Sequence, residues 1–472
     1  MKETSRPWWQ ASAVQLGQAY RSGQVTPSAV ATACLARIAE VNPRLNAFVA
    51  LREAFLQDAQ ASTERHARRQ PLSLLDGVPL SIKDNLLTCD MPTSWGCRAL
   101  AGHRSEEDET PVARARAAGA LLVGKTNVPE FTLEGYTDNA LFGTTRNPWN
   151  LALTPGGSSG GAVAGVASGC TPLALATDGG GSIRRPASHT GLVGFKPSLG
   201  AVAREHALPT LLLDFEVVGP IARTVADARL LFDALRGPTQ RDRRSLAASA
   251  AATLASQGPA ALPARVLYVP AMNGAAVDPE IAQCCLQAAG RLRQLGHHVT
   301  AGELPLDLRW MNESWPEVAQ IGLAALFSSH PHWREDAATK YQAMATAGQA
   351  LPASRLWQLI GEIDELRLAC SRLFETYDLI VMPSAAALPW PAQEAFPPEI
   401  DGKKVGPRGH AVFTGWVNAA GLPAVALPAS PAANGLPIGI QLIGAYGTDV
   451  ALLDLAERYE ALAPWAGRWP AL

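Results

Sequence analysis

The sequence predicts an α/β fold: one large domain in which a central mixed β-sheet is flanked by helices on both faces. Three observations lead to this prediction. Short apolar strands alternate with helical segments along the 472 residues, a pattern typical of α/β proteins. Only 17% of the residues are charged, against roughly 25% in an average chain, so much of the chain is interior. No long Pro-rich or Gly/Ser-rich linker divides the chain, and no internal repeat is evident.

The individual elements follow from apolar runs and from residues that start or stop helices. Thr26 is the expected N-cap and Pro27 the first residue of a helix that we expect to stop at Asn42-Pro43. The Ala/Ser-rich span from Ser245 to Ala264 is expected to be a surface connection. Further helices are expected to begin at Thr110 and at Asp278, and strands to cover residues 77–82, 120–123, 172–178, 265–269, 298–304, 378–384, 423–429 and 438–444.

Charge and cysteine content exclude several classes of protein. The net charge is −2 with acidic and basic residues well mixed, so no basic stripe indicates a nucleic-acid partner. The seven cysteines are odd in number and form no C-x-x-C, which argues against a disulfide framework and a zinc knuckle. The N-terminus MKETSRPWWQ has no apolar signal core, and we therefore expect a cytoplasmic protein.

One long uncharged stretch raises the question of membrane insertion. No charged residue lies between Arg146 and Asp178. The stretch contains TPGGSSGG and a further Thr-Pro, so it cannot form one continuous spanning helix. Glycines at every fourth position from Gly157 to Gly169 instead indicate a helix that packs closely on a sheet in a protein that does not enter a membrane.

The segment TDGGGSIRRPA, residues 177–187, places Ser182 after a run of glycines, as expected for an exposed nucleophile. A histidine base is not evident. The chain has neither H-E-x-x-H nor G-x-S-x-G, and no P-loop. His189 lies seven residues further along an expected helix, which points it away from Ser182, and we expect it to be a packed or capping side chain.

Lys83 is the remaining candidate for a base. It ends the apolar run GVPLSI, and taken alone it would be a solvated lysine at a strand end. Its interpretation changes because three segments occur together in one chain: GVPLSIKDN, TPGGSSGGAVAG and TDGGGSIRRPA.

These three segments resemble those of the amidase signature family, whose members hydrolyse amide C–N bonds with a Ser–cis-Ser–Lys triad. The lysine of the family matches Lys83, its cis-serine matches Ser158, and its nucleophile matches Ser182. The spacing between the two serines is the one that the family uses. The resemblance continues through NPWN, GFKPS, VVGPIARTVADA and GLPAVALPA…GLPIGIQLIG, and so covers nearly the whole chain. It implies a signature core at about residues 75–225 and a pocket-forming C-terminal half at about residues 265–465 of a single domain, residues 1–472.

The resemblance also implies a mechanism. A lysine, whose pKa is ordinarily about 10.4, can act as a base if burial keeps it neutral. Ser182 would form an acyl-enzyme, and no metal or organic cofactor is expected. By resemblance, the Gly157–Ser158 peptide is cis, Ser159 supports the relay, Asp178 and Arg184 pair beneath the loop, and the oxyanion hole consists of the N–H groups of Gly179, Gly180, Gly181 and Ser182.

The substrate is not named by the sequence. Many family members have a larger residue at Gly179, and glycine there is expected to widen the wall of the site, as in the branch with aryl acylamidases and urethane-cleaving enzymes. A small, neutral amide, anilide or carbamate with an apolar body is therefore the expected substrate, hydrolysed by a monomer or homodimer. Six tryptophans are candidates for a pocket lining: Trp310, Trp315, Trp333, Trp357, Trp390 and Trp416.

Two other functions are compatible with this family resemblance. One is the amidase subunit of a tRNA-dependent amidotransferase, which usually reads like SLDQxGP where this chain has LLLDFEVVGP, residues 211–220. The missing glutamine favours a free-standing amidase. The other is a catalytically silent binding protein on the same fold, which the intact Lys83, Ser158 and Ser182 disfavour.

Overall fold

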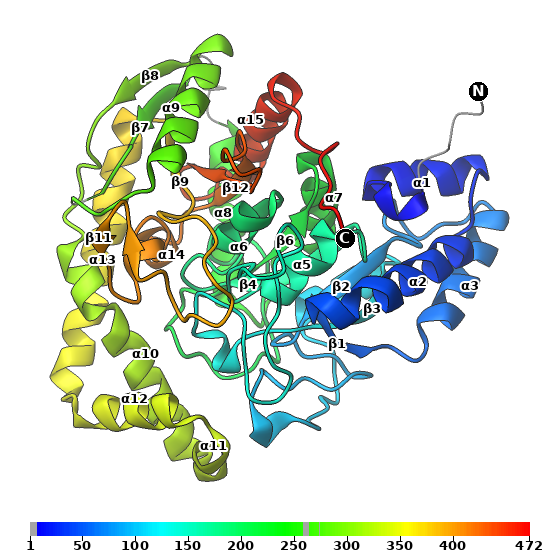
Figure 1. The fold of residues 1–472 in the computed structure, drawn as a ribbon, viewed down its shortest axis with the longest axis horizontal. Coiled ribbons are helices and arrows are strands. Elements are labelled where there is room, and N and C mark those ends of the chain that lie inside the picture. The colour runs from blue at the N-terminus through cyan, green and yellow to red at the C-terminus, as the bar shows by residue number, and fades with distance from the viewer. Residues whose placement is uncertain (1–6, 258–263, 273) are drawn as a thin grey trace.

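A computed structural model describes residues 7–257, 264–272 and 274–472. An eleven-stranded mixed sheet runs through the whole domain (Figure 1). Its strands, in spatial order, are β1 (Phe48–Leu51), β3 (Leu121–Thr126), β2 (Pro79–Lys83), β4 (Leu173–Asp178), β6 (Val217–Ala222), β5 (Val193–Lys196), β12 (Ala424–Pro428), β13 (Gly439–Ile443), β9 (Leu379–Pro383), β7 (Arg265–Tyr268) and β8 (His298–Ala301).

The directions of the strands explain why the sheet is mixed. β2 pairs in parallel with β3 and with β4, and β7 pairs in parallel with β8 and β9. The strands between these two parallel groups are joined by antiparallel pairs, as is the edge strand β1. Strands from the expected signature core and from the C-terminal half thus belong to one sheet, and the predicted α/β architecture is confirmed.

Helices cover both faces of this sheet, and β4 shows why. Leu173 and Leu175 lie in the large hydrophobic core with α1 (Ala13–Ser22), α7 (Val225–Leu235) and α15 (Asp449–Leu462). The alternate residues of β4, Ala174 and Ala176, pack instead against α5 (Gly160–Ala167) and α6 (Arg184–Thr190). Successive side chains of a strand point to opposite faces, so this strand is buried on both sides.

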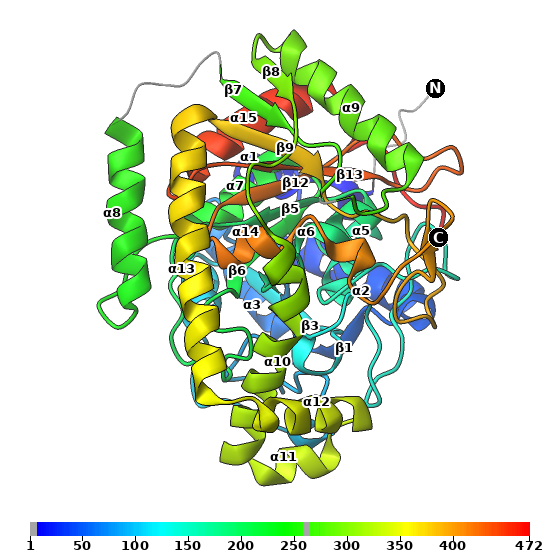
Figure 2. The ribbon, with the colours of Figure 1, turned by 90° about the vertical axis from the view of Figure 1, so that its left-hand side faces the viewer.

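The other helices are α2 (Pro27–Leu45), α3 (Phe55–Ala67), α4 (Thr110–Ala117), α8 (Arg243–Gln257), α9 (Pro279–Gln294), α10 (Arg309–Ser329), α11 (Pro331–Asp336), α12 (Thr339–Ala350), α13 (Ala353–Thr376) and α14 (Gly415–Ala419). Helices α4 and α9 contribute to the large hydrophobic core. Helices α10, α11 and α12 lie beyond the sheet, at the lower left of Figure 1, and α8 stands apart from the body in Figure 2.

One sequence-based expectation was wrong. Helix α2 does not stop at Asn42-Pro43 but continues to Leu45. Pro43 lies in its last turn, where it removes a single amide donor, and Asn46 ends the helix in the left-handed conformation.

The Ala/Ser-rich span forms the largely exposed helix α8 up to Gln257, because alanine favours helix and no Gly or Pro interrupts it there. Residues 258–263 of that span lie outside the described residues.

The uncharged stretch between Arg146 and Asp178 forms a loop, the short helix α5 and strand β4. Helix α5 has eight residues. Throughout the described residues, no helix combines the length and the apolar character that crossing a membrane requires.

Candidate active site

The ends of two neighbouring strands position the predicted base and the glycine loop. β2 ends at Lys83 and β4 ends at Asp178, and the two strands pair in parallel with Leu80 opposite Leu173. The carboxyl ends of parallel strands meet at the same edge of a sheet, where α/β proteins bind ligands. Lys83 therefore lies beside the start of the glycine run, although the two segments are far apart in the sequence.

Three oxygen atoms surround the amine of Lys83. Its Nζ lies 2.8 Å from Oγ of Ser158, 2.9 Å from Oγ1 of Thr177 and 3.1 Å from the carbonyl oxygen of Thr177. The side chain is completely buried, and no carboxylate of the described residues forms an ion pair with it. Burial lowers the pKa of Lys83 to about 7, against the opposing charges of Glu216 and Asp178.

The three contacts can be satisfied by either protonation state of Lys83. As an ammonium, Nζ donates one hydrogen bond to each of the three oxygen atoms. As a neutral amine, it keeps two N–H groups for the carbonyl and the hydroxyl of Thr177, and its lone pair can accept the O–H of Ser158. The lowered pKa of Lys83 makes the neutral form accessible near pH 7, and the distance from Nζ to Ser158 then allows a proton transfer between them.

Ser158 and Ser159 lie just before helix α5. The Gly157–Ser158 peptide is cis, as the resemblance implies. Ser159 N–H donates to the carbonyl of Ser182 at 3.3 Å, and its hydroxyl donates to the carbonyl of Thr177 at 3.4 Å. Ser159 therefore links the loop of Ser158 to the loop of Ser182.

Ser182 stands between the glycine run and helix α6, and only 7% of its surface is exposed. Among the described residues no hydrogen bond joins its hydroxyl to that of Ser158. Catalytic hydrogen bonds are often long without substrate and tighten when it binds. The structure thus holds one link of the expected relay, from Ser158 to Lys83, and leaves the second link open.

The carboxylate of Asp178 organises the glycine loop from below. It accepts the N–H of Gly181 at 2.6 Å and of Ile183 at 3.1 Å, and Nε and Nη2 of Arg184 each donate to it at 3.0 Å. Asp178 and Arg184 are both completely buried. Although burial alone raises the pKa of the Asp178 carboxyl, the charge and hydrogen bonds of Arg184 bring that pKa well below its usual range. Asp178 is therefore a fixed negative charge beneath the loop.

Two residues of the C-terminal half hold the same loop from the other side. Asn418 donates to the carbonyl and to the carboxylate of Asp178, and the hydroxyl of Thr414 donates to the carbonyl of Gly180 at 2.8 Å. Neither Asn418 nor Thr414 was predicted as a site residue. The role of Thr177 was not predicted either, although Thr177 directly precedes Asp178 in the segment TDGGGSIRRPA.

The backbone N–H groups of the loop are not all available for an oxyanion. Gly181, whose φ of +113° suits glycine, gives its N–H to Asp178. The N–H groups of Gly179, Gly180 and Ser182 have no acceptor in the part of the chain that the structure describes. Three of the four predicted donors are thus free to receive a ligand.

Neighbouring side chains close the space above the glycines. A Cβ at position 179 would stand 2.9 Å from Cδ1 of Leu212, and one at position 180 would stand 2.7 Å from Cζ2 of Trp315. The expectation that Gly179 widens the wall was wrong, because Leu212 fills the space that glycine leaves. Among the six candidate tryptophans, Trp315 lies against the glycine loop.

The other candidate tryptophans lie in several different environments. Trp357 is 77% exposed and lines nothing. Trp416 is buried in a hydrophobic core, and Trp333 belongs to another. Trp390 contacts His189 edge to face, with ring centroids 5.6 Å apart. Ordinary packing therefore accounts for several of the tryptophans that the sequence offered as a pocket lining.

His189 is a packed side chain, as expected. Its Nε2 lies 3.2 Å from the carbonyl oxygen of Ala387, and within the described structure it has no hydrogen bond to Ser182. Burial lowers the pKa of His189 to about 4. A histidine with this pKa is neutral near pH 7.

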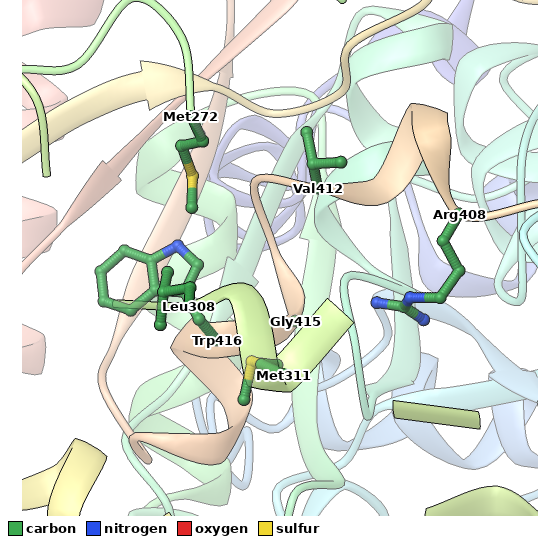
Figure 3. A pocket seen from close by; sticks show the side chains of 7 residues that line it. All are labelled: Met272, Leu308, Met311, Arg408, Val412, Gly415 and Trp416. Atoms are coloured by element: carbon green, nitrogen blue, oxygen red, sulfur yellow. The ribbon is translucent and has the colours of Figure 1, made fainter. Parts of the chain in front are cut away.

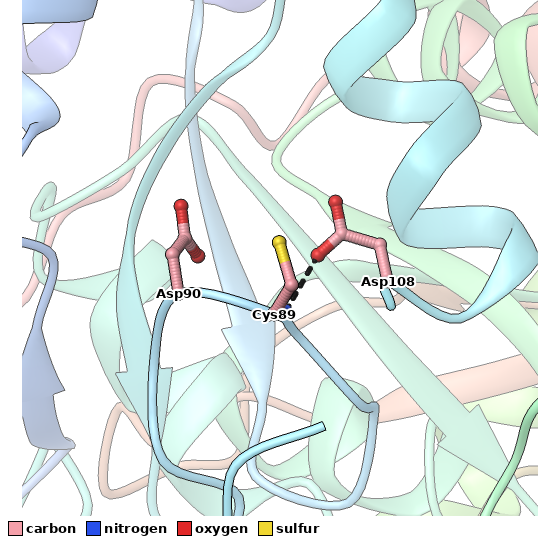
Figure 4. A group of neighbouring side chains, drawn as sticks. All are labelled: Cys89, Asp90 and Asp108. Atoms are coloured by element: carbon pink, nitrogen blue, oxygen red, sulfur yellow. Dashed lines mark hydrogen bonds between the residues drawn. The ribbon is translucent and has the colours of Figure 1, made fainter. Parts of the chain in front are cut away.

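One group of side chains has the composition of a metal site. Ligand atoms of Cys89, Asp90 and Asp108 lie within 4.8 Å of one another (Figure 4). Arg116 forms ion pairs with both carboxylates, and Arg52 forms one with Asp90. These arginines neutralise the carboxylates, so the group is explained as a surface ion-pair network.

Comparison with known proteins places this geometry in a family. The family described as Amidase matches residues 29–453. An acylamidase of Rhodococcus erythropolis is 31% identical over 481 residues, covering 100% of this chain and 99% of the relative. One subunit of the glutamyl-tRNA(Gln) amidotransferase of Symbiobacterium thermophilum is 32% identical over 489 residues, with 98% of each covered.

Solved structures of similar proteins have the same fold as this chain. A bacterial aryl acylamidase of the amidase signature family has a TM-score of 0.85 at 29% identity, covering 97% of this chain and 99% of that one. A 6-aminohexanoate cyclic dimer hydrolase also has a TM-score of 0.85, at 28% identity, with 98% and 99% covered. The chain belongs to the amidase signature family. It is an amidohydrolase, as the resemblance of its three segments implied.

Proposed function

We propose that this amidase hydrolyses linear amides, anilides and related carbamates through an acyl-enzyme on Ser182, with Lys83 as the base. The observation that carries the proposal is the contact between the buried Nζ of Lys83 and Oγ of Ser158 at 2.8 Å. Burial without a carboxylate partner lowers the pKa of Lys83 to about 7, so the neutral amine, which is a base, is available near that pH.

The first half of the reaction forms the acyl-enzyme. Ser182 loses its proton to Ser158 as its oxygen attacks the carbonyl carbon, while Ser158 passes its own proton to Lys83. Negative charge develops on the carbonyl oxygen, which the N–H groups of Gly179, Gly180 and Ser182 receive. Asp178 and Arg184 support this step by holding the loop.

The second half releases the products. Lys83, now protonated, returns a proton through Ser158 to the nitrogen of the leaving amine, which breaks the C–N bond. Water then attacks the ester of Ser182, and the same relay removes its proton and regenerates the free serine. Every step uses groups of this chain, and we expect activity without a metal or an organic cofactor.

The substrate class is supported by the relatives. An acylamidase and an aryl acylamidase are among the similar proteins. A carbamate offers the same carbonyl and the same nitrogen leaving group, and it belongs in the substrate panel for that chemical reason. The C-terminal half contributes Trp315 and Thr414 beside the glycine loop, so we assign to it the walls that select the substrate.

The role of Ser182 is tested by a fluorophosphonate and by an anilide with a chromogenic amine. The wild-type enzyme should release a burst of amine, and mass spectrometry should find one label on the peptide with Ser182. Ser182→Ala should lose the label and the turnover while its melting temperature stays at the wild-type value. Ser256→Ala, a change on the exposed surface of α8, serves as the control. Normal turnover by Ser182→Ala would refute the assignment.

The amidase component of a tRNA-dependent amidotransferase stays a second candidate, because one such relative is 32% identical over nearly the whole chain. The segment LLLDFEVVGP, residues 211–220, lacks the glutamine that such components usually have. Assays of glutamine and of para-nitroanilides with the purified chain separate the two. Glutamine hydrolysis only in the presence of a partner protein would favour the amidotransferase.

We further propose that the enzyme works in the cytoplasm as a monomer or homodimer without a nucleic-acid partner. All seven cysteines are unpaired thiols, and six of them are buried, which suits a reducing compartment. Light scattering of the purified protein and fractionation of the source cells are the corresponding measurements.

A further inference from the structure

A pair of arginines without carboxylate partners lies beside the glycine loop. Arg185 follows Arg184 on helix α6, and Arg408 lies before the segment that leads into α14. In the described structure neither side chain has a carboxylate within 4.0 Å. Arg204, also near the site, shows the contrast, since Glu109 and Glu216 both pair with it.

Arg408 has the more unusual surroundings. Its guanidinium lies over the ring of Trp315, 4.4 Å from the centroid, and its side chain makes no hydrogen bond with any described residue. Nε is sealed from solvent and has no acceptor. Burial, together with the charge of Arg185, lowers the pKa of Arg408 to about 9. A charge in this setting is costly unless an anion joins it.

The side chain of Arg408 lines a small cavity between α10 and α14. Figure 3 shows its guanidinium pointing toward Gly415, and a Cβ there would stand 3.2 Å from Nη2. The cavity of about 10 Å³ is lined by apolar side chains and Arg408, among them Met311 and Trp416. It holds about one water molecule, so the guanidinium has room for only a small group.

Trp315 connects this guanidinium to the glycine loop. One edge of the indole, at Cζ2, lies 2.7 Å from the Cβ position of Gly180, and Cζ3 lies 3.1 Å from that of Gly415. One aromatic ring thus separates the N–H groups that would receive the oxyanion from the guanidinium of Arg408. Phe215 stacks on the same indole, with ring centroids 5.6 Å apart, so Trp315 is fixed in this position.

His410, which lies beside Arg185, is neutral and does not compensate the charge of the arginines. Nη1 of Arg185 donates to Nε2 of His410 at 3.0 Å, which requires a neutral imidazole. Burial and the nearby charges of Arg185, His189 and Arg408 keep the pKa of His410 well below its usual value. In the described structure the wall beside the glycine loop therefore has two positive charges without a carboxylate within 4.0 Å.

We propose that the substrate of this amidase carries a carboxylate, and that Arg408 binds this group where its guanidinium stacks on Trp315. A carboxylate is the planar anion that a guanidinium binds with two parallel hydrogen bonds. The inference rests on the proposed function, since it names the substrate class of the same site. It changes the expectation of a fully neutral substrate: the body stays apolar, and one end is anionic.

The test uses two matched pairs of anilides, one for each side of the scissile bond. On the acyl side, glutaryl para-nitroanilide is compared with the neutral anilide in which an isopropyl group replaces the carboxylate. On the amine side, the hexanoyl amide of para-aminobenzoate is compared with that of para-isopropylaniline. We expect wild-type kcat/KM to favour the carboxylate in one pair by about 10- to 100-fold.

Variants test whether Arg408 causes the preference for a carboxylate. Arg408→Met, which keeps an apolar stem, should reduce the ratio within that pair to about one, whereas Arg408→Lys should retain part of it. Arg309→Met removes a positive charge from the exposed start of α10 and should keep the wild-type ratio. If Arg408→Met does not fold, the kcat/KM ratio of Arg408→Lys still tests the proposal.

Binding to Ser182→Ala separates this inference from the proposed function. If wild type cleaves none of the anilides, the proposed function fails, and calorimetry with Ser182→Ala still tests the anion site. Tighter binding of a carboxylate ligand that is lost with Arg408→Met supports the inference. Equal kcat/KM within both pairs, or an Arg408→Met variant that lowers both members of a pair equally, overturns it while the hydrolase assignment stands.

Discussion

Asn418 donates two hydrogen bonds to Asp178, one to its main-chain carbonyl at 2.7 Å and one to its carboxylate at 2.9 Å, across 240 positions of the chain. The amide of Asn418 thereby connects the glycine loop at the end of β4 to helix α14. Both residues are buried, so neither bond can be replaced by bulk water. The nucleophile loop is consequently held by the C-terminal half as well as by its own strand.

Replacing Asn418 should weaken both the fold and the loop. Asn418→Ala leaves a buried carboxylate and a buried carbonyl each short of one donor, which should cost about 2–3 kcal/mol of unfolding free energy. We expect a lower melting temperature and a reduced kcat, measured by calorimetry and by anilide turnover. Asn418→Ala with the stability and kcat of wild type would show that the two hydrogen bonds do not hold the loop.

The pH dependence should report Lys83. Its amine is active when neutral, so the acylation rate should rise with pH through a pKa of about 7 and level off above it. The rate falls on the acid side because protonation of Nζ removes the lone pair that accepts from Ser158. Stopped-flow measurement of the burst phase over roughly two pH units on either side of that pKa gives the profile.

Three variants test which residue causes this pH dependence. Lys83→Ala should lose about 10²- to 10⁴-fold in acylation together with the pH dependence. Lys83→Arg should do no better, since guanidinium stays charged over the working range. His189→Gln should leave the profile in place, because His189 bonds to Ala387. A profile that disappears in His189→Gln and persists in Lys83→Ala would contradict the lysine mechanism.

We expect the hydroxyl of Thr177 to contribute to catalysis by positioning the amine of Lys83. That oxygen accepts from Nζ of Lys83 at 2.9 Å and from Nδ2 of Asn85 at 3.0 Å. Thr177→Val removes the acceptor and keeps the shape of the side chain, so kcat should fall about 10-fold with KM little changed. Thr177→Ser keeps the hydroxyl and should retain most of the activity. Equal kcat for both variants would leave positioning of Lys83 to the main-chain carbonyl alone.

We expect that only glycine fits at position 180, because the ring of Trp315 lies against it. Gly180→Ala would bring a Cβ to 2.7 Å from Trp315, so the indole must move and kcat/KM should decrease. Gly290→Ala is a matched control, since nothing lies within 4 Å of its Cβ position on helix α9. That control should stabilise the protein by about 1 kcal/mol. Unchanged kinetics of Gly180→Ala would mean that Trp315 does not form the wall of the substrate site.

Chelation should leave the activity unchanged. EDTA and a dipicolinate chelator are applied to the purified enzyme, followed by dialysis and an anilide assay. The proton transfer and charge stabilisation that we propose use Lys83, Ser158 and backbone N–H groups. Loss of activity that a single added metal restores would show that the reaction has another participant.

The sequence predicted those parts of the site that lie within short segments. GVPLSIKDN and TDGGGSIRRPA each contain a strand end and its functional residue, and parallel pairing of β2 and β4 brings those ends together. Asn418 and Arg408 could not be found this way. They reach the site from segments that are distant in the chain, and no local pattern indicates which loop they will contact.

The fold was predicted to a similar extent. Long apolar runs such as PLALATD identified strands correctly, whereas β1, β5 and β6 of the central sheet were not recognised as strands. Pro43 stopped the predicted helix because proline is a local signal, but tertiary packing and the left-handed Asn46 carried the helix to Leu45. The Ala/Ser-rich span suited both loop and helix by composition, and no local residue decided between them.

The base and the nucleophile loop are positioned by adjacent strands, whereas the residues that we propose to bind the substrate lie outside the sheet. Lys83 and Asp178 end β2 and β4, whose hydrogen-bonded spacing fixes the distance between the two strand ends. Trp315 lies on α10, and Arg408 lies in the loop before α14. Both segments also touch the nucleophile loop, because Trp315 lies against the glycine run and Thr414, shortly after Arg408, donates a hydrogen bond to it. A substitution in either segment is therefore expected to change the catalytic rate together with the substrate preference.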